Sequence, residues 1–180
     1  SAVSGDGLIV YTLPTLAEGV AVSASYATAG EAHEGSAGFS LTYTGVEGLS
    51  VSYGKADDNG TVGTSIDQTV MKASYAYGPI TVGYSNNDYD HTTAASDQET
   101  TSYNVSYTVS DAISISYGEE TIDMDGATTA DIEVSGYTVS YTSGGMTLSA
   151  MGVKADDVDM LSATANNDNE MWKLAASFAF

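Results

Sequence analysis

Apolar and polar residues alternate along most of this chain, and one short phrase returns throughout it. The segment ISISYGEE, residues 113–120, places isoleucines and a tyrosine on one side of an extended strand and serines and a glycine on the other. Related phrases occur at residues 21–27, 39–45, 49–55, 80–86, 103–109 and 137–143. A recurring phrase indicates a recurring structural unit. Its period of two predicts β-strands with one apolar and one polar face.

Turn residues divide this alternation into about eleven predicted strands of roughly eight to twelve residues, the length of a tilted strand that crosses a bilayer. The predicted strands are 7–13, 19–28, 37–44, 48–55, 67–77, 79–87, 99–109, 112–121, 132–142, 146–154 and 169–180. Short turns and longer polar loops alternate between them, as in outer-membrane barrels with short periplasmic turns and long external loops. The predicted fold class is therefore all-β, an antiparallel up-and-down transmembrane β-barrel.

In such a barrel the apolar face of each strand contacts lipid, and the serine face lines a water-filled lumen. The pore-lining residues are then predicted to be Lys72, Lys173, Ser74, Ser114, Ser116 and Ser177. A lysine in the lumen supplies a fixed charge that tunes ion selectivity, and an equally good interpretation is that Lys72 and Lys173 only balance nearby acids. Lys55 and Lys154 fall at the outer rim, where ion pairing or snorkelling suits them better.

Aromatic residues recur near the predicted strand ends, where tyrosine and tryptophan favour the boundary between hydrocarbon and headgroups. With the long loops placed outside, the external belt is predicted at Tyr26, Tyr53, Tyr84, Tyr117 and Trp172. The periplasmic belt is predicted at Tyr43, Tyr75, Tyr77, Tyr107, Tyr141, Phe178 and Phe180.

The charge is strongly one-sided, with 24 acids, four lysines and a formal net charge of −20. Only Glu18, Glu47 and Asp111 lie in the short turns, so the external rim is predicted to be anionic. Such a surface repels nucleic acid and favours cations. The acidic loop clusters fit solvated charge or divalent cations as partners; none has the spacing of an EF-hand, and no metal site is predicted.

Several function classes find no support in the residues. There is no cysteine for a disulfide or a thiolate metal site, and no apolar run long enough for a spanning helix. The histidines, His33 and His91, lie in different loops, and the motifs GxSxG and HExxH are absent. We therefore expect neither an enzyme nor a cofactor.

Four segments of the chain resemble the Gram-negative general diffusion porins, most closely those of alphaproteobacteria: residues 7–26, 77–85, 144–150 and 174–180. A chain that ends on Phe180, with Trp172 and Phe178 on the same face, is similar to the signal read by the barrel-assembly machinery. The resemblance implies an outer-membrane location in a Gram-negative bacterium. It also implies a homotrimer of barrels with about sixteen strands, through which small hydrophilic solutes and ions diffuse passively.

In those porins about five further strands precede the segment that begins at Gly7 here, to reach about sixteen, and one of their loops folds inward as a constriction. Closing an odd-numbered meander would pair its first and last strands in parallel, which bacterial barrels avoid. An open sheet would expose unpaired edges to lipid. We therefore expect residues 1–180 to form a single barrel portion, the C-terminal two-thirds of a porin without its N-terminal strands and constriction loop.

An alternative function remains from another class. The chain would then be an acidic β-protein displayed on the cell surface, a structural protein or a receptor, for adhesion or calcium-bridged packing without channel activity. A soluble sandwich would bury the isoleucines of residues 113–120 in a core and dissolve without detergent. A receptor barrel would not conduct ions, whereas a porin should.

The terminal aromatic residue provides a direct test of the assembly signal. We expect Phe180→Ala to reduce the amount of folded protein in the outer membrane, measured by heat-modifiable gel mobility of membrane fractions. Wild-type levels of folded protein would contradict the role of Phe180 as the signal.

Overall fold

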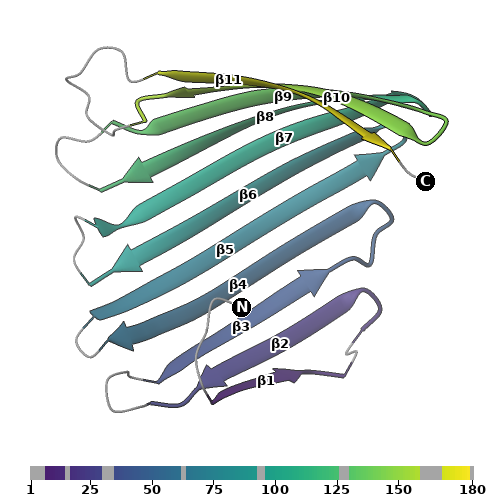
Figure 1. The fold of residues 1–180 in the computed structure, drawn as a ribbon. Helices are drawn as coiled ribbons and strands as arrows, with labels where there is room; N and C mark the ends of the chain where they lie inside the picture. The colour runs from purple at the N-terminus through teal and green to yellow at the C-terminus, as the bar shows by residue number, and fades with distance from the viewer. Residues whose placement is uncertain are drawn as a thin grey trace.

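The computed structural model describes residues 7–14, 17–29, 35–61, 64–92, 96–125, 130–158 and 168–178. These residues form eleven β-strands in one antiparallel sheet, in which each strand pairs with the next along the chain (Figure 1). The strands are β1 (Leu8–Thr12), β2 (Val20–Ala27), β3 (Ser36–Tyr43), β4 (Leu49–Thr61), β5 (Thr64–Tyr77), β6 (Ile80–His91), β7 (Gln98–Ser110), β8 (Ile113–Met124), β9 (Ile132–Ser143), β10 (Met146–Asp156) and β11 (Asn169–Phe178). The expected up-and-down meander is confirmed.

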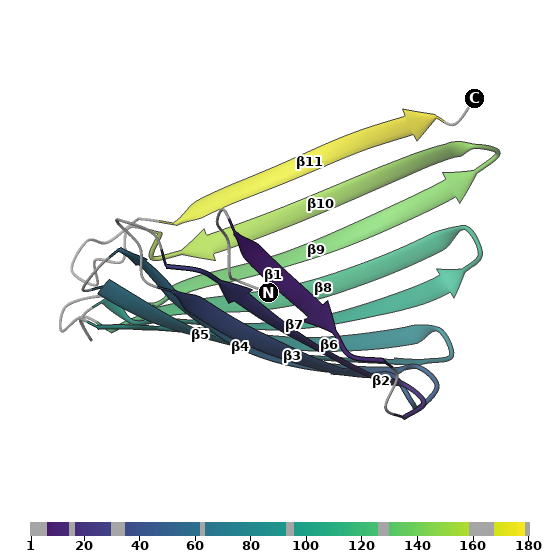
Figure 2. The same cartoon turned by 90° about the horizontal axis from the view of Figure 1, so that it is seen from below.

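The sheet is curved, and its two edge strands bend toward the same side (Figures 1 and 2). β1 and β11 each have a single neighbour in the sheet, β2 and β10 respectively. The described strands therefore form an open trough, with a concave and a convex face. No helix long and apolar enough to cross a membrane occurs among the described residues.

The strands extend further than the sequence predicted at the end where β4 joins β5 and β6 joins β7. β4 continues to Thr61, β5 begins at Thr64 and β6 continues to His91. Parts of two predicted loops, 56–66 and 87–98, therefore belong to paired strands. The polar residues there were interpreted as loop, but they continue the strand pairing of β4 with β5, in which Asp57 lies directly opposite Asp67. We call this end of the sheet the loop end and the opposite end the turn end.

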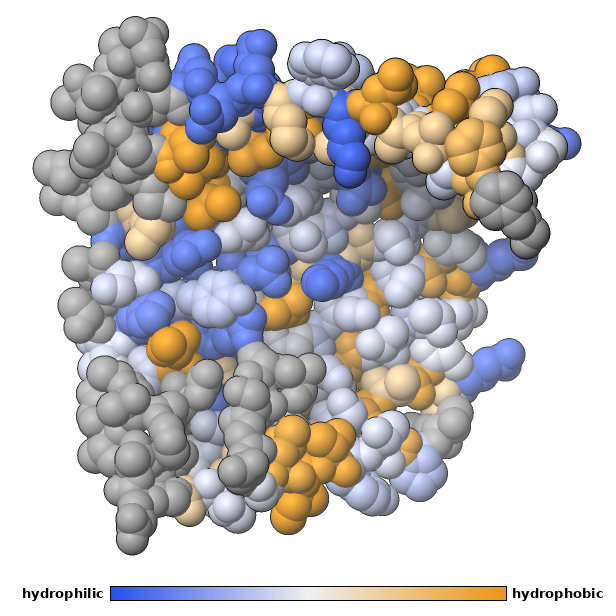
Figure 3. Space-filling view, in the orientation of Figure 1, coloured by the Kyte–Doolittle hydropathy of each residue, from blue (hydrophilic) through white to orange (hydrophobic). Residues whose placement is uncertain are grey.

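Side chains of directly opposite residues point to the same face of a sheet, so the register assigns each residue to a face. The concave face carries mainly serine, threonine, glycine and asparagine, as the pale and blue middle of the surface shows (Figure 3). The convex face carries the large apolar and aromatic residues, for example Leu41 opposite Tyr53 and Val105 opposite Tyr117.

This sheet has almost no buried apolar core. Ala27 and Ala56 are the buried hydrophobic residues of the described chain, and both are small. Large side chains on the convex face remain exposed, including Trp172 at 82% and Leu174 at 71%. The apolar surface must therefore be covered by something other than this sheet, and a bilayer provides that cover.

Glycines make the short turns possible at the turn end. β9 and β10 are joined by Gly144 and Gly145, which both have positive φ and lie between the paired residues Ser143 and Met146. Two positive φ values are what a type I′ hairpin turn requires. Gly48, with φ +76°, accepts a hydrogen bond from the backbone N–H of Ala76 at 2.8 Å.

We expect Gly48→Ala to destabilise the folded sheet more than Gly78→Ala. Both positions have positive φ, which costs an alanine about 1–2 kcal/mol. A Cβ at Gly48 would also lie 2.1 Å from the carbonyl oxygen of Ala76, whereas one at Gly78 meets no atom within 4 Å. The measurement is the temperature at which each variant loses its folded gel mobility, and equal temperatures would contradict the steric argument.

Candidate functional site: the concave wall

The concave wall is a continuous surface of small polar side chains. Hydroxyl groups of neighbouring strands contact one another across it: Ser23 and Ser40 at 2.7 Å, Thr42 and Ser52 at 3.1 Å, and Thr142 and Thr147 at 3.0 Å. These groups retain capacity for further hydrogen bonds, because each hydroxyl can donate one and accept two. The wall can therefore be wetted along its length.

The register places all six residues predicted to line a pore on this concave face. Ser52 lies opposite Lys72 and Ser50 opposite Ser74. The same face continues through the other strands to Ser114, Ser116, Lys173 and Ser177.

Few of the charged side chains that the structure describes belong to this wall. Among the described strand side chains, the lysines and carboxylates on the concave face are Lys72, Lys173 and Glu120, by their register. The others point to the convex side, near the loop end: Lys55, Asp57, Asp67, Asp88, Asp90, Glu99, Glu119, Asp123, Glu133, Lys154, Asp156 and Glu170. The sequence predicted an anionic rim, and the structure adds that the described strand carboxylates, except Glu120, lie on the convex face.

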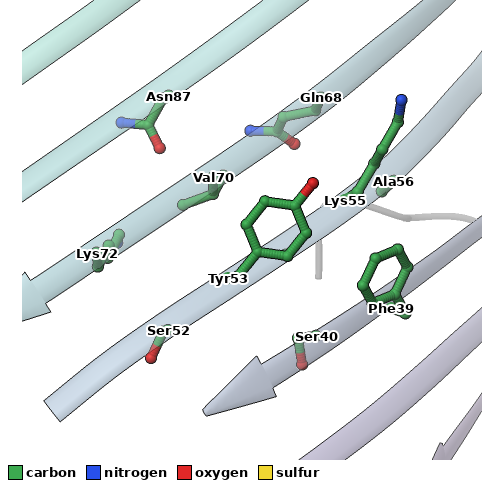
Figure 4. Close-up of a pocket in the computed structure, with 11 residues that line it drawn as sticks. Phe39, Ser40, Ser52, Tyr53, Lys55, Ala56, Gln68, Val70, Lys72 and Asn87 are labelled. Atoms are coloured by element: carbon green, nitrogen blue, oxygen red, sulfur yellow. The ribbon is translucent and has the colours of Figure 1, made fainter. Parts of the chain in front are cut away.

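Lys72 borders a hollow of about 360 Å³ in the wall. Its lining comes from four adjacent strands, with Gln68, Val70 and Lys72 on β5 and Asn87 on β6 (Figure 4). The glycine at position 54 contributes no side chain, which leaves the hollow open between β3 and β5. The residues directly opposite Lys72 on the neighbouring strands are Ser52 and Ser85, and neither carries a carboxylate. The exposed ammonium of Lys72 can therefore contact a hydrated anion.

All eleven predicted belt residues in the described part of the chain lie on the convex face, as the register shows for Tyr26, Tyr43, Tyr53, Tyr75, Tyr77, Tyr84, Tyr107, Tyr117, Tyr141, Trp172 and Phe178. Phe180 and His33 lie outside the described residues.

Sequence reasoning missed two further members of the belt nearer the loop end. Tyr103 lies opposite Tyr84, with ring centroids 5.1 Å apart, and Tyr137 lies opposite Tyr117. Both lie near the middle of their strands, β7 and β9, whereas belt residues were expected at strand ends. The alternation alone could have found them, because Tyr103 and Tyr137 stand four residues before Tyr107 and Tyr141 on the same face.

The two rim lysines form ion pairs, as expected. Lys55 Nζ lies 3.4 Å from Asp67, and Lys154 Nζ lies 2.7 Å from Asp156. Among the described residues, no group of three or more histidines and carboxylates has an arrangement that could hold a metal ion. Directly opposed carboxylates such as Asp88 and Glu99 therefore act as solvated like charges, which weaken pairing locally.

A one-layer sheet with an apolar convex face, an aromatic belt and a wet concave face is part of the wall of an outer-membrane β-barrel. The profile of the Gram-negative porin family matches residues 3–129, and the chain belongs to that family. This membership places it in the outer membrane and points to a channel rather than an enzyme. It offers nothing in favour of the surface-display alternative.

Solved structures share the fold. An anion-selective porin from Comamonas acidovorans has 19% identity and a TM-score of 0.70, with 96% of this chain and 59% of that chain covered. OmpT, an outer-membrane protein of Vibrio cholerae, has 18% identity and a TM-score of 0.66, with coverages of 95% and 64%. Pseudomonas aeruginosa OccK10 has 14% identity and a TM-score of 0.61, with coverages of 94% and 62%. Comparison with curated proteins finds no match.

The absence of native cysteine makes the assignment of faces directly testable. We expect Ser116→Cys, on the concave face, to react with a charged, membrane-impermeant thiol reagent in outer-membrane vesicles. The adjacent Ile115→Cys, on the convex face, should react only after the barrel is denatured, because its thiol faces lipid. Equal labelling of both variants in intact membranes would contradict the assignment.

Proposed function

We propose that this chain forms most of the wall of a channel for passive diffusion of small hydrophilic solutes and ions across the outer membrane. The observation that supports the proposal is the continuous small polar face opposite a continuous apolar face. A solute in such a channel keeps water and hydroxyl groups around it, so it avoids most of the cost of entering hydrocarbon. Passage then depends on the width of the pore and on its fixed charges.

The barrel is proposed to be completed by further strands. The chain covers 59% of the porin from Comamonas acidovorans, and the outer edges of β1 and β11 have no partner in the described sheet. Unpaired backbone groups in hydrocarbon cost several kcal/mol each, so strands that pair with both edges are strongly favoured. We infer that residues 1–180 are a single portion, the C-terminal two-thirds, of a barrel with about sixteen strands.

Lys72 and Lys173 are proposed to set the ion preference of the lumen, with Ser74, Ser114, Ser116 and Ser177 as neutral wall. Two lysines and one carboxylate among the described concave side chains favour anions over cations near the wall, despite the net charge of −20. In a narrow, partly screened lumen a single fixed charge acts over about a Debye length, ~8 Å at physiological salt.

Partners are proposed from the family resemblance. The particle is a homotrimer, assembled by the barrel-assembly machinery through the terminal Phe180. The outward carboxylates of the loop end form an anionic rim that attracts divalent cations. This attraction is diffuse, because no grouping among the described residues has the arrangement of a defined metal site.

The experiment is conductance in a planar bilayer, with reversal potentials measured in a salt gradient. The assembled protein should conduct, and Lys72→Glu should shift the reversal potential toward cations by changing the local wall charge by two units. Lys154→Glu, the same change on the convex face of β10 and away from the hollow beside Lys72, is the matched control and should give little shift. Absence of conductance would contradict the proposed function, and equal shifts would remove Lys72 from the permeation path.

A further inference from the structure

The concave face has one region that does not fit a wholly hydrophilic pore. Toward the loop end of β8–β11 it carries six apolar side chains, which we call the inner-wall patch: Ile122, Ile132, Val134, Met151, Val153 and Met171. Figure 3 shows a group of hydrophobic side chains over the loop ends of these strands, whereas the wall over β3–β7 is mostly pale or blue.

The patch is contiguous. Ile122 lies opposite Ile132, and Val153 lies opposite Met171. Between these pairs, Gly136 faces Val153 and contributes no side chain; a Cβ there would lie 3.4 Å from a methyl group of Val153. The apolar side chains therefore surround a short stretch of β9 without side-chain cover at Gly136.

Strand formation does not require apolar residues at these positions. At a similar height on the adjacent strands β6 and β7, the concave face pairs Asn87 with Thr100 and Tyr89 with Gln98. Toward the loop end of β8–β11 the strands still alternate, but apolar residues now lie on the concave face and polar residues on the convex face. Glu133, for example, points outward between the inward Ile132 and Val134. Apolar surface that faces a wet lumen is unfavourable unless something apolar covers it.

A cation stands at the border of the patch. Lys173 lies directly opposite Met151 and two residues from Met171 on the same face. No ion pair of Lys173 is found within the described part of the chain, and Met171 is 54% exposed. The carboxylate at the other border, Glu120, is already engaged, because Ser102 donates a hydrogen bond to it at 2.8 Å.

We propose that the inner-wall patch and Lys173 form a weak binding site for amphipathic carboxylates in the lumen. The carboxylate of the solute pairs with the ammonium of Lys173, and its alkyl or aryl body covers Met171, Val153 and Val134. Met171 and Val153 lie two residues along the strands from Lys173, about 7–8 Å away. Val134 lies four residues along and two strand spacings across, about 17 Å away, a distance that the extended lysine side chain and the solute span together. The inference rests on the proposed channel and names a class of solute for it.

Such a site suits diffusion because its contacts are weak and exchange rapidly. Burial of a methylene group contributes at most about a fourfold gain in affinity, and contact with one open wall buries each methylene only in part. The solute is therefore concentrated at the wall without being trapped, the condition for passage through a channel with binding sites.

The test is a chain-length series in planar bilayers containing the assembled protein. Acetate, butyrate, hexanoate and octanoate are added separately, and block of the chloride current is titrated. Affinity should rise by about twofold per methylene, roughly half of the full-burial value, and should exceed that of hexanol and hexylammonium at equal length. Chain-length independence, or equal block by hexylammonium, would overturn the proposal.

Variants locate the effect. Val134→Thr and Val153→Thr keep side-chain shape and should flatten the chain-length dependence while conductance persists. Val139→Thr, on the convex face of β9, is the matched control and should leave the dependence unchanged. Lys173→Gln should remove the preference for hexanoate over hexanol.

The outcomes separate this inference from the proposed function. If the protein conducts but shows no chain-length effect, the channel proposal stands and the wall site is contradicted; this is also the result expected if another part of the chain covers the patch. If the protein does not conduct, the channel proposal itself is contradicted. Persistence of the chain-length effect in Val134→Thr and Val153→Thr would place the binding elsewhere and overturn the assignment.

Discussion

The structure depends on one constraint, that backbone N–H and C=O groups facing hydrocarbon have no water to bond and must pair with a neighbouring strand. A meander in which every strand pairs with the next in sequence meets this requirement with the shortest connections. The usual source of stability, a packed interior, is nearly absent, since Ala27 and Ala56 are the buried hydrophobics of the described residues. Backbone pairing and lipid contact take its place.

The surroundings of the sheet place different demands on the side chains of its two faces. Each convex residue between the belts must be compatible with lipid, so isoleucine, valine and tyrosine recur there. A concave residue needs only to fit beside its neighbours and tolerate water, so serine, asparagine, lysine and methionine all occur. A substitution on the concave face therefore leaves the lipid-facing surface unchanged.

The period-two pattern was sufficient to predict the eleven strands, their order and the face of each residue that it singled out. It failed at the loop end, where Asp57 and Asp88 resembled loop residues although they belong to paired strands. Polar side chains indicate that a strand is surrounded by water, and they do not indicate that the strand has ended. These strands continue beyond the apolar band. The inner-wall patch was missed for the same reason: in Ile132-Glu133-Val134 an apolar residue was assumed to face lipid, and only the register shows that it faces inward.

The separation of charge between the faces has a consequence for how such proteins are compared. Isoelectric point, electrophoretic mobility and retention on an ion exchanger report all 24 acids of the chain, including those of the loops and of the convex face. Under the proposed function, ion preference in the lumen would depend on the few inward charges, which among the described strand side chains are Lys72, Lys173 and Glu120. Two homologues with the same isoelectric point can therefore prefer opposite ions, and bulk acidity is a poor guide to what passes through the barrel.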